Sequence, residues 1–180
     1  MKPRFVPWLT LCVFVVCGAF TAAQFVWPQL IPALQRQPSM FEKWELWRLV
    51  TSWLVHTDGW TQIVGNFISL LVIGTLAEWL TSRWLWLLAF FAGGISGNVI
   101  GYFWQPYGAG NSIAFYGLLG LLAAWLLSHP VRNARVRYGL PLIVAALAFV
   151  LCMLQDVHGV PLLVGLLVGL AAYRTVGRAE

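Results

Sequence analysis

The sequence predicts an all-α protein that crosses a membrane several times, and three observations support this fold class. Of the 180 residues, 60% are hydrophobic and 9% are charged, whereas a soluble domain has roughly 25% charged residues. The mean hydropathy is +0.78. The apolar residues gather in runs, and the lengths of these runs are close to the length of about 20 residues that a spanning helix needs. We therefore expect one membrane-embedded domain over residues 1–180, a polytopic bundle of six transmembrane helices.

The expected spans leave little chain for a separate soluble domain. They lie near residues 5–25, 61–81, 84–104, 112–128, 138–154 and 159–173. The first run could be a signal peptide, but it reaches Phe25 without a small-residue cleavage site before Trp27. Because such a site marks a cleaved leader, we interpret residues 5–25 as an uncleaved first helix.

The basic residues orient these spans, because Lys and Arg favour cytoplasmic loops. With six spans, one side of the membrane holds Lys2, Arg4, Arg83, Arg132, Arg135, Arg137, Arg174 and Arg178. The other side holds basic residues only in the first loop, 26–60. Both chain ends are therefore expected to be cytoplasmic. This topology accounts for the net charge of +5, and no motif points to a nucleic-acid partner.

The first outer loop, 26–60, is expected to lie on the outer leaflet. Residues 41–53 mix tryptophans with charged residues, a composition typical of amphipathic segments at a membrane interface. Such a segment either shapes access to a site or serves as a simple interfacial anchor.

Several residues within the spans are expected to be structural. Glycines four residues apart favour close helix packing, as at Gly93, Gly97 and Gly101. Ser96 stands in a short G-x-S-G pattern, but no glycine-rich loop leads into it, so we interpret it as a packing residue. Glu78 is expected to cap or pair with a loop. The spacing of Cys12, Cys17 and Cys152 suits neither a metal site nor a disulfide, and we expect no metal or cofactor.

One glycine-rich turn, residues 108–110, leads directly into an apolar helix that begins at Ser112. This run is short, so its start is expected below the outer surface, where irregular backbone needs cover from protein or a wet cavity. Tyr116 and Gly120 follow on the same helical face. The cytoplasmic His129 is on the wrong side to help Ser112, whereas His158 opens the sixth span on the outer side.

Topology brings three chemically useful groups together, because the second, fourth and sixth spans all start from the outer face. Asn66, Ser112 and His158 lie near these starts. A serine needs a base to become a nucleophile, and an imidazole suits that role. We predict a Ser112–His158 dyad for acyl transfer, with Tyr116 packed on the imidazole. Asp156 is expected to face solvent, which leaves no acid to orient the histidine.

Donors for a tetrahedral oxyanion are also available near these span starts. The candidates are the side-chain amide of Asn66, the backbone N–H of Ser112, and possible contributions from Gln62 or His56. Gln62 and Asn66 are four residues apart and share a helical face. Gly165 lies on the face of His158 and would let the fourth and sixth helices touch. We group Gly110 and Gly120 with it as helix-packing glycines.

These motifs, taken in order, resemble the rhomboid intramembrane serine proteases in their compact six-helix bacterial form. The resemblance runs from about Glu45 to Leu170. It comprises Glu45-Leu46-Trp47-Arg48, then His56 with Asn66, then Gly110-Asn111-Ser112 with Tyr116 and Gly120, and finally His158 with Gly165. The chain departs from the family pattern at Ile113, where glycine is usual, and at Gln62, where a histidine is expected.

The resemblance implies an integral protein of the bacterial inner membrane that cleaves single-span membrane proteins near the outer end of an unstable helix. Two other interpretations remain. A rhomboid-like protein without proteolysis would bind or escort membrane helices; the presence of both Ser112 and His158 argues against it, and Ile113 argues weakly for it. A small transporter or channel subunit would have charged residues lining its spans, and this sequence has almost none.

Overall fold

The computed structural model describes residues 5–176, and this part of the chain is helical and has no β-strand. Within residues 5–176, four helical runs are long and apolar enough to cross a membrane. They are α1 (Trp8–Val26), the continuous run of α5 (Gly59–Ser69), η1 (Leu70–Gly74) and α6 (Thr75–Leu80), then α7 (Arg83–Trp104), and the run of η2 (Arg135–Gly139) and α9 (Leu140–Met153). Two shorter apolar helices, α8 (Ser112–Ser128) and α10 (Gly159–Val176), complete the set.

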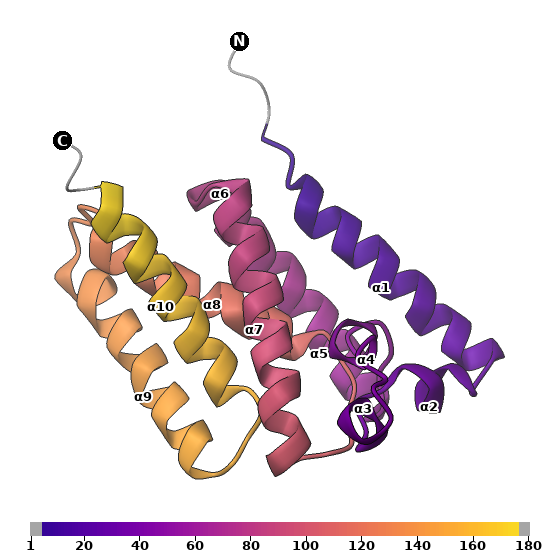
Figure 1. Cartoon of the computed structure of the whole chain (residues 1–180). Helices are drawn as coiled ribbons and strands as arrows, with labels where there is room; N and C mark the ends of the chain where they lie inside the picture. The colour runs from indigo at the N-terminus through magenta and orange to yellow at the C-terminus, as the bar shows by residue number, and fades with distance from the viewer. Residues whose placement is uncertain (1–4, 177–180) are drawn as a thin grey trace.

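The helices coincide with the six predicted runs, which confirms the all-α membrane bundle. That all six cross the membrane stays a prediction, because α8 and α10 are shorter than the other runs. The start of α1 and the end of α10 lie at one end of the bundle, and α2–α4 lie at the other (Figure 1). Lys2, Arg4 and Arg178, which we used to predict the topology, lie outside the described residues.

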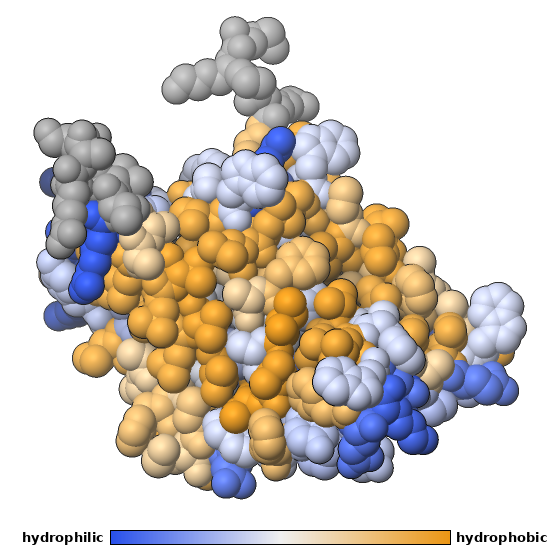
Figure 2. Space-filling view, in the orientation of Figure 1, coloured by the Kyte–Doolittle hydropathy of each residue, from blue (hydrophilic) through white to orange (hydrophobic). Residues whose placement is uncertain are grey.

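The centre of the bundle is α8, which packs against both α7 and α10. Most of its residues in the first three turns are buried, including Ala114, Leu118 and Leu121. By contrast, α1 and α9 bury few residues and lie at opposite margins of the bundle (Figure 1). Figure 2 shows hydrophobic residues across the middle of one face and hydrophilic residues gathered toward its ends, as a membrane-embedded surface requires.

Glycines allow the three central helices to touch through their backbones. A Cβ on Gly165 of α10 would overlap the carbonyl oxygen of Gly117 on α8, and a Cβ on Gly93 of α7 would lie 2.8 Å from the Gly117 Cα. A Cβ on Gly120 would overlap the carbonyl oxygen of Leu162. Gly93, Gly120 and Gly165 thus lie where these helices approach closely, and helix packing is the role that we propose for them.

The carboxylate of Glu78 caps the start of α1. It accepts hydrogen bonds from the backbone N–H groups of Leu9 and Thr10 and from the Thr10 hydroxyl, each at 3.0 Å. The first amides of a helix have no partner within the helix, and a negative charge there is favourable. Glu78 is thus structural, as predicted.

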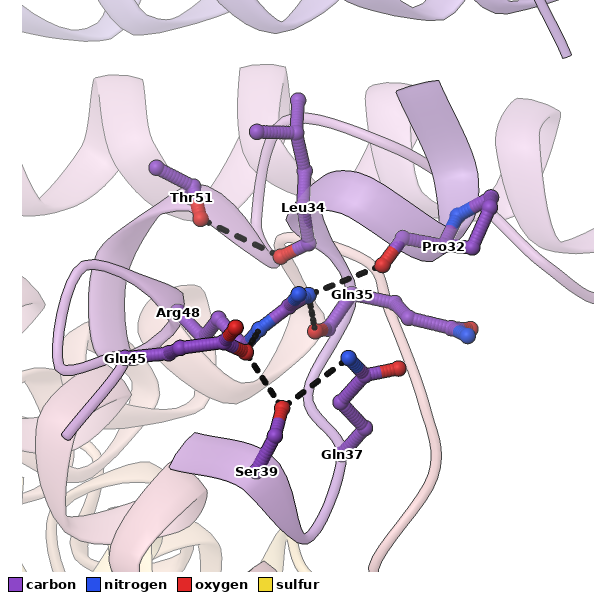
Figure 3. A network of polar contacts seen from close by, with 8 residues as sticks. All are labelled: Pro32, Leu34, Gln35, Gln37, Ser39, Glu45, Arg48 and Thr51. Atoms are coloured by element: carbon purple, nitrogen blue, oxygen red, sulfur yellow. Dashed lines mark hydrogen bonds and ion pairs between the residues drawn. The ribbon is translucent and has the colours of Figure 1, made fainter. Parts of the chain in front are cut away.

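The segment between α1 and α5 folds into three short helices, α2 (Leu30–Leu34), α3 (Ser39–Glu42) and α4 (Arg48–Thr51). Buried Arg48 ties them together (Figure 3): its Nη1 donates to the carbonyl oxygens of Pro32 and Gln35, both at 2.9 Å, and its Nε donates to Glu45 at 2.6 Å. Hydrogen bonds from Ser39 and Arg48 lower the pKa of Glu45.

The tryptophans of this segment face outward, except for one that is buried. Trp44 and Trp47 are exposed, whereas Trp53 is buried in the core. Exposed tryptophans suit a membrane interface, where the ring meets lipid and the N–H meets water. The segment therefore combines the outward character of an interfacial anchor with a folded interior.

We expect Gly165→Ala to push α10 away from α8 and to destabilise the protein. The added methyl would meet backbone atoms of Gly117, which cannot rotate aside, and overpacking of this kind costs about 1–3 kcal/mol. Thermal unfolding in detergent measures the effect. Gly139→Ala is the matched control, because a Cβ there has no atom within 4 Å; equal unfolding midpoints for the two variants would contradict the proposed contact.

We expect Arg48→Ala to lower the unfolding midpoint as well. Two partly buried carbonyl oxygens lose their donor, and each unsatisfied polar group costs about 1–3 kcal/mol. Arg132→Ala serves as a control, because Arg132 is exposed. If both variants unfold at the wild-type temperature, Arg48 does not hold this segment together.

Candidate active site

Ser112 is the first residue of α8 and follows a turn that is held from several sides. Gly110 has a φ of +129°, a conformation that side chains disfavour, and its N–H donates to the Ser52 carbonyl oxygen at 2.8 Å. Arg36 and Gly108 exchange two backbone hydrogen bonds, at 2.9 and 3.3 Å. The hydroxyl is thereby presented at a fixed point on the loop-rich end of the bundle.

The imidazole of His158 lies against this hydroxyl. Its Nε2 is 2.8 Å from the Ser112 Oγ. The ring of Tyr116 packs against the imidazole with the ring centroids 4.5 Å apart. The structure thus brings together Ser112, His158 and Tyr116, as the sequence predicted, at the start of α10 and the first turns of α8.

Asp156 corrects one expectation. We predicted that this carboxylate faces solvent and that no acid orients His158, but its Oδ1 lies 2.6 Å from His158 Nδ1 and only 31% of the side chain is exposed. The chain turns sharply at Gln155, which has a φ of +55°, and this turn directs Asp156 back toward the histidine. Hydrogen bonding by His158 lowers the pKa of Asp156.

Two cavities meet at the Ser112–His158 pair. One, of about 300 Å³, is mainly polar and lies under the loops, lined among others by Arg36, Gln105 and Gly108. The second, of about 430 Å³, runs along α5 and α8 and is lined among others by Asn66 and Leu119. Ser112 and His158 line both cavities, so the pair can be reached from two directions.

The two amides of α5 approach the same turn but differ in their bonding. The Nε2 of Gln62 donates to the Ala109 carbonyl oxygen at 2.7 Å, and its Oε1 accepts from the N–H groups of Thr57 and Asp58. The Nδ2 of Asn66 is buried and has no hydrogen-bond partner. A Cβ on Gly110 would lie 2.9 Å from this nitrogen, so Asn66 presents a free donor beside the turn.

The structure places His56 away from the serine. It is buried between α1 and α5, where its Nδ1 lies 3.0 Å from the Thr21 hydroxyl and its ring packs against Phe67. It lines neither cavity that holds Ser112. Burial lowers the pKa of His56 to about 4, so it is neutral at physiological pH and structural.

Gly110 also differs from its expected role. We grouped it with the helix-packing glycines, but it lies in the turn before α8 and its close neighbours are the side-chain amides of Gln62 and Asn66. Ser96 donates to its own helix at the Gly93 carbonyl oxygen, as a packing serine does. His129 packs against Trp125 and Tyr173 and lines neither cavity.

Sequence reasoning missed the buried Arg36, which we treated only as a charge of the first loop. Its Nε donates to the Gln105 carbonyl oxygen and its Nη1 to Asn98 Oδ1, and a Cβ on Gly101 would lie 2.7 Å from its guanidinium. Gly101 and Asn98 lie one turn apart on α7, where the glycine leaves room for a side chain and the amide can bond to it. This pair is the sequence signal that could have indicated a polar side chain packed across α7. In the described residues, no three His, Cys, Asp or Glu side chains gather as metal ligands.

Comparisons with known proteins identify the family of the chain. A family model described as the Rhomboid domain matches residues 43–179. The chain is also 33% identical over 95 residues to "Rhomboid protease GluP" of Bacillus subtilis (strain 168). That match covers 52% of this chain but only 18% of the length of the relative. Since the family model spans both Ser112 and His158 and well over half of the sequence, the chain is an integral membrane protein that belongs to the rhomboid family.

Proposed function

We propose that the protein is a serine endopeptidase that cleaves transmembrane segments of other membrane proteins near the outer face. Family membership suggests intramembrane protease activity. The observation that carries the proposal is the 2.8 Å contact between Ser112 Oγ and His158 Nε2. This distance lies within the range for proton transfer between a nucleophile and its base.

In the proposed reaction, the Ser112 oxygen attacks the carbonyl carbon of the scissile peptide bond while His158 Nε2 takes the hydroxyl proton. The tetrahedral intermediate then collapses, the C–N bond breaks, and the leaving amine receives that proton from the imidazole. Water next attacks the acyl carbon while His158 accepts one of its protons. The ester C–O bond then breaks, the Ser112 oxygen takes that proton from the imidazole, and the acid product and the free serine result.

Asn66 is the proposed side-chain donor to the oxyanion. Its buried Nδ2 has no partner in the resting protein, and a buried donor left free is costly unless a bound group satisfies it. The backbone N–H of Ser112, at the start of α8, would be the second donor. Gln62 is the weaker candidate, because its amide already holds the turn at Ala109.

The two cavities suggest separate routes for the two reactants. The mainly polar cavity under the loops suits water for hydrolysis of the acyl-enzyme. The cavity between α5 and α8 contains apolar side chains such as Ile73 and Leu119, which suit an unwinding helix of a single-span substrate. We further propose that the bacterial inner membrane is the location and that both chain ends are cytoplasmic.

We expect a fluorophosphonate probe to label the wild-type protein in detergent and to leave both Ser112→Ala and His158→Ala unlabelled. The probe forms a bond only with an activated serine. Ser96→Ala is the matched control and should label like the wild type. Mass spectrometry of a co-expressed single-span protein then gives the cut position, expected near the outer end of its helix and after a small residue.

Other outcomes of this experiment reject the proposal. Loss of labelling in Ser96→Ala with labelling retained in Ser112→Ala would identify a different nucleophile. A folded wild-type protein that neither labels nor cleaves would favour the rhomboid-like protein that binds or escorts helices.

We expect Asn66→Ala to reduce kcat by about 10²–10³-fold, the usual loss on removal of one oxyanion donor, with little change in KM. The measurement is cleavage of the identified substrate at several concentrations. Ser69→Ala, one turn further along the same cavity, should keep kcat within about threefold, because a residue there is too far along α5 to reach the turn at Ser112. A matching loss in both variants would argue against a donor role for Asn66.

A further inference from the structure

We propose that Asp156 is a positioning residue, which orients His158 and stabilises the imidazolium that forms when Ser112 loses its proton. This inference rests on the proposed function and deepens it, because it converts the predicted pair into a line of three side chains. The line runs from Ser112 Oγ to His158 Nε2 at 2.8 Å and from His158 Nδ1 to Asp156 Oδ1 at 2.6 Å.

The carboxylate fixes the imidazole through two hydrogen bonds from one residue. Asp156 Oδ1 accepts the backbone N–H of His158 at 2.9 Å as well as the ring nitrogen at 2.6 Å. Two bonds to one oxygen restrict both the backbone and the ring of His158. The ring edge that remains free faces the serine.

The same contact selects the tautomer. An ionised carboxylate can only accept hydrogen bonds, so His158 Nδ1 must carry the proton. The lone pair of Nε2 is then directed at Ser112, which is the form that a general base requires. Hydrogen bonding by His158, followed by a contribution from Gln105, lowers the pKa of Asp156, which keeps the carboxylate ionised at neutral pH.

The turn that places Asp156 is held by its own bonds. The N–H of Asp156 donates to the Leu151 carbonyl oxygen at 2.8 Å, and the Gly159 N–H donates to the Asp156 carbonyl oxygen at 3.2 Å. A Cβ on Gly159 would lie 2.7 Å from the backbone nitrogen of Cys152. The end of α9 and the start of α10 therefore set the carboxylate beside the histidine before any substrate binds.

Other groups near His158 do not supply this charge. Tyr116 packs against the ring, and Asp58 lines the same two cavities. The Asp58 carboxylate is instead bonded to the Thr57 hydroxyl and to Gln62. Asp156 is the carboxylate placed to pair with the imidazolium.

The competing explanation is that Asp156 only caps the start of α10. Asn caps a helix as well as Asp, and its side-chain oxygen could still accept the His158 N–H. Asp156→Asn therefore keeps the cap and removes the charge, whereas Asp156→Ala removes both. Glu42→Gln is the control for loss of one negative charge, because Glu42 is exposed and lines neither cavity.

We expect Asp156→Asn to lower kcat and the rate of fluorophosphonate labelling by about 10- to 100-fold, with KM within twofold, because a hydrogen bond to a charged group is lost. Asp156→Ala should lower both rates at least as much, and Glu42→Gln by less than threefold. Asp156→Asn rates within twofold of wild type would leave Asp156 as a helix cap and overturn the inference. A change confined to KM would overturn it as well.

A second measurement tests the orientation without turnover. The protein has three histidines, so ¹⁵N-histidine NMR with His158→Ala identifies the signals of His158. In the wild type at neutral pH we expect the proton on Nδ1, and in Asp156→Asn a mixture of tautomers. A wild-type proton on Nε2 would overturn the inference. If His158 carries its proton on Nδ1 but Ser112 is never labelled, the proposed function fails and the orientation stands.

Discussion

The contact between α8 and α10 is the constraint on which the site depends. Ser112 and His158 lie at the starts of different helices, so the distance between α8 and α10 limits how closely the two side chains can approach. Gly117, Gly120 and Gly165 let the backbones touch, and helix association in a membrane relies on such packing because apolar burial gives little drive there. The same glycine, Gly117, also receives α7 through Gly93. One small surface on α8 therefore sets the position of both neighbours, and with them the Oγ–Nε2 distance.

Polar backbone near the site is the second physical requirement. The turn that ends at Gly110 is irregular, and such backbone is tolerated at depth only where protein or a wet cavity covers it. Arg36 and Ser52 supply that cover from the segment before α5, and Asn98 connects them across α7: its Nδ2 donates to Ser52 Oγ at 2.8 Å, and its Oδ1 accepts from Arg36. The segment between α1 and α5 thus supports the turn that carries Ser112, through contacts with partners far away in the sequence.

The separation of interacting residues along the sequence explains which features the sequence could predict. The spans, the glycine contacts and the meeting of Ser112 with His158 follow from hydropathy, helical period and topology, which depend on local pattern. The contact of Asp156 with His158 was not predicted, because it depends on the left-handed backbone conformation of Gln155. The residue types around Gln155 do not require that conformation. The structural roles of Arg36 and His56 were not predicted for a different reason. Their side-chain partners lie at least 32 residues away in the sequence, and a single sequence does not reveal such pairs. We treated His56 as a candidate oxyanion donor and Arg36 only as a charge of the first loop, but both are buried groups bonded to the surrounding structure.

The departure from the family pattern at Gln62 illustrates how a site can divide its tasks between residues. Histidine is the residue expected there by resemblance, and an imidazole has two ring nitrogens for hydrogen bonds. Gln62 instead uses all its bonding on the loops, with Oε1 on the two amides of Thr57 and Asp58 and Nε2 on Ala109 and Asp58. The Gln62 amide holds the turn, whereas Asn66 Nδ2, one turn further along α5, has no hydrogen-bond partner. Glutamine at this position therefore gives the turn that carries Ser112 an additional anchor and leaves Asn66 as the amide beside the turn whose nitrogen has no partner.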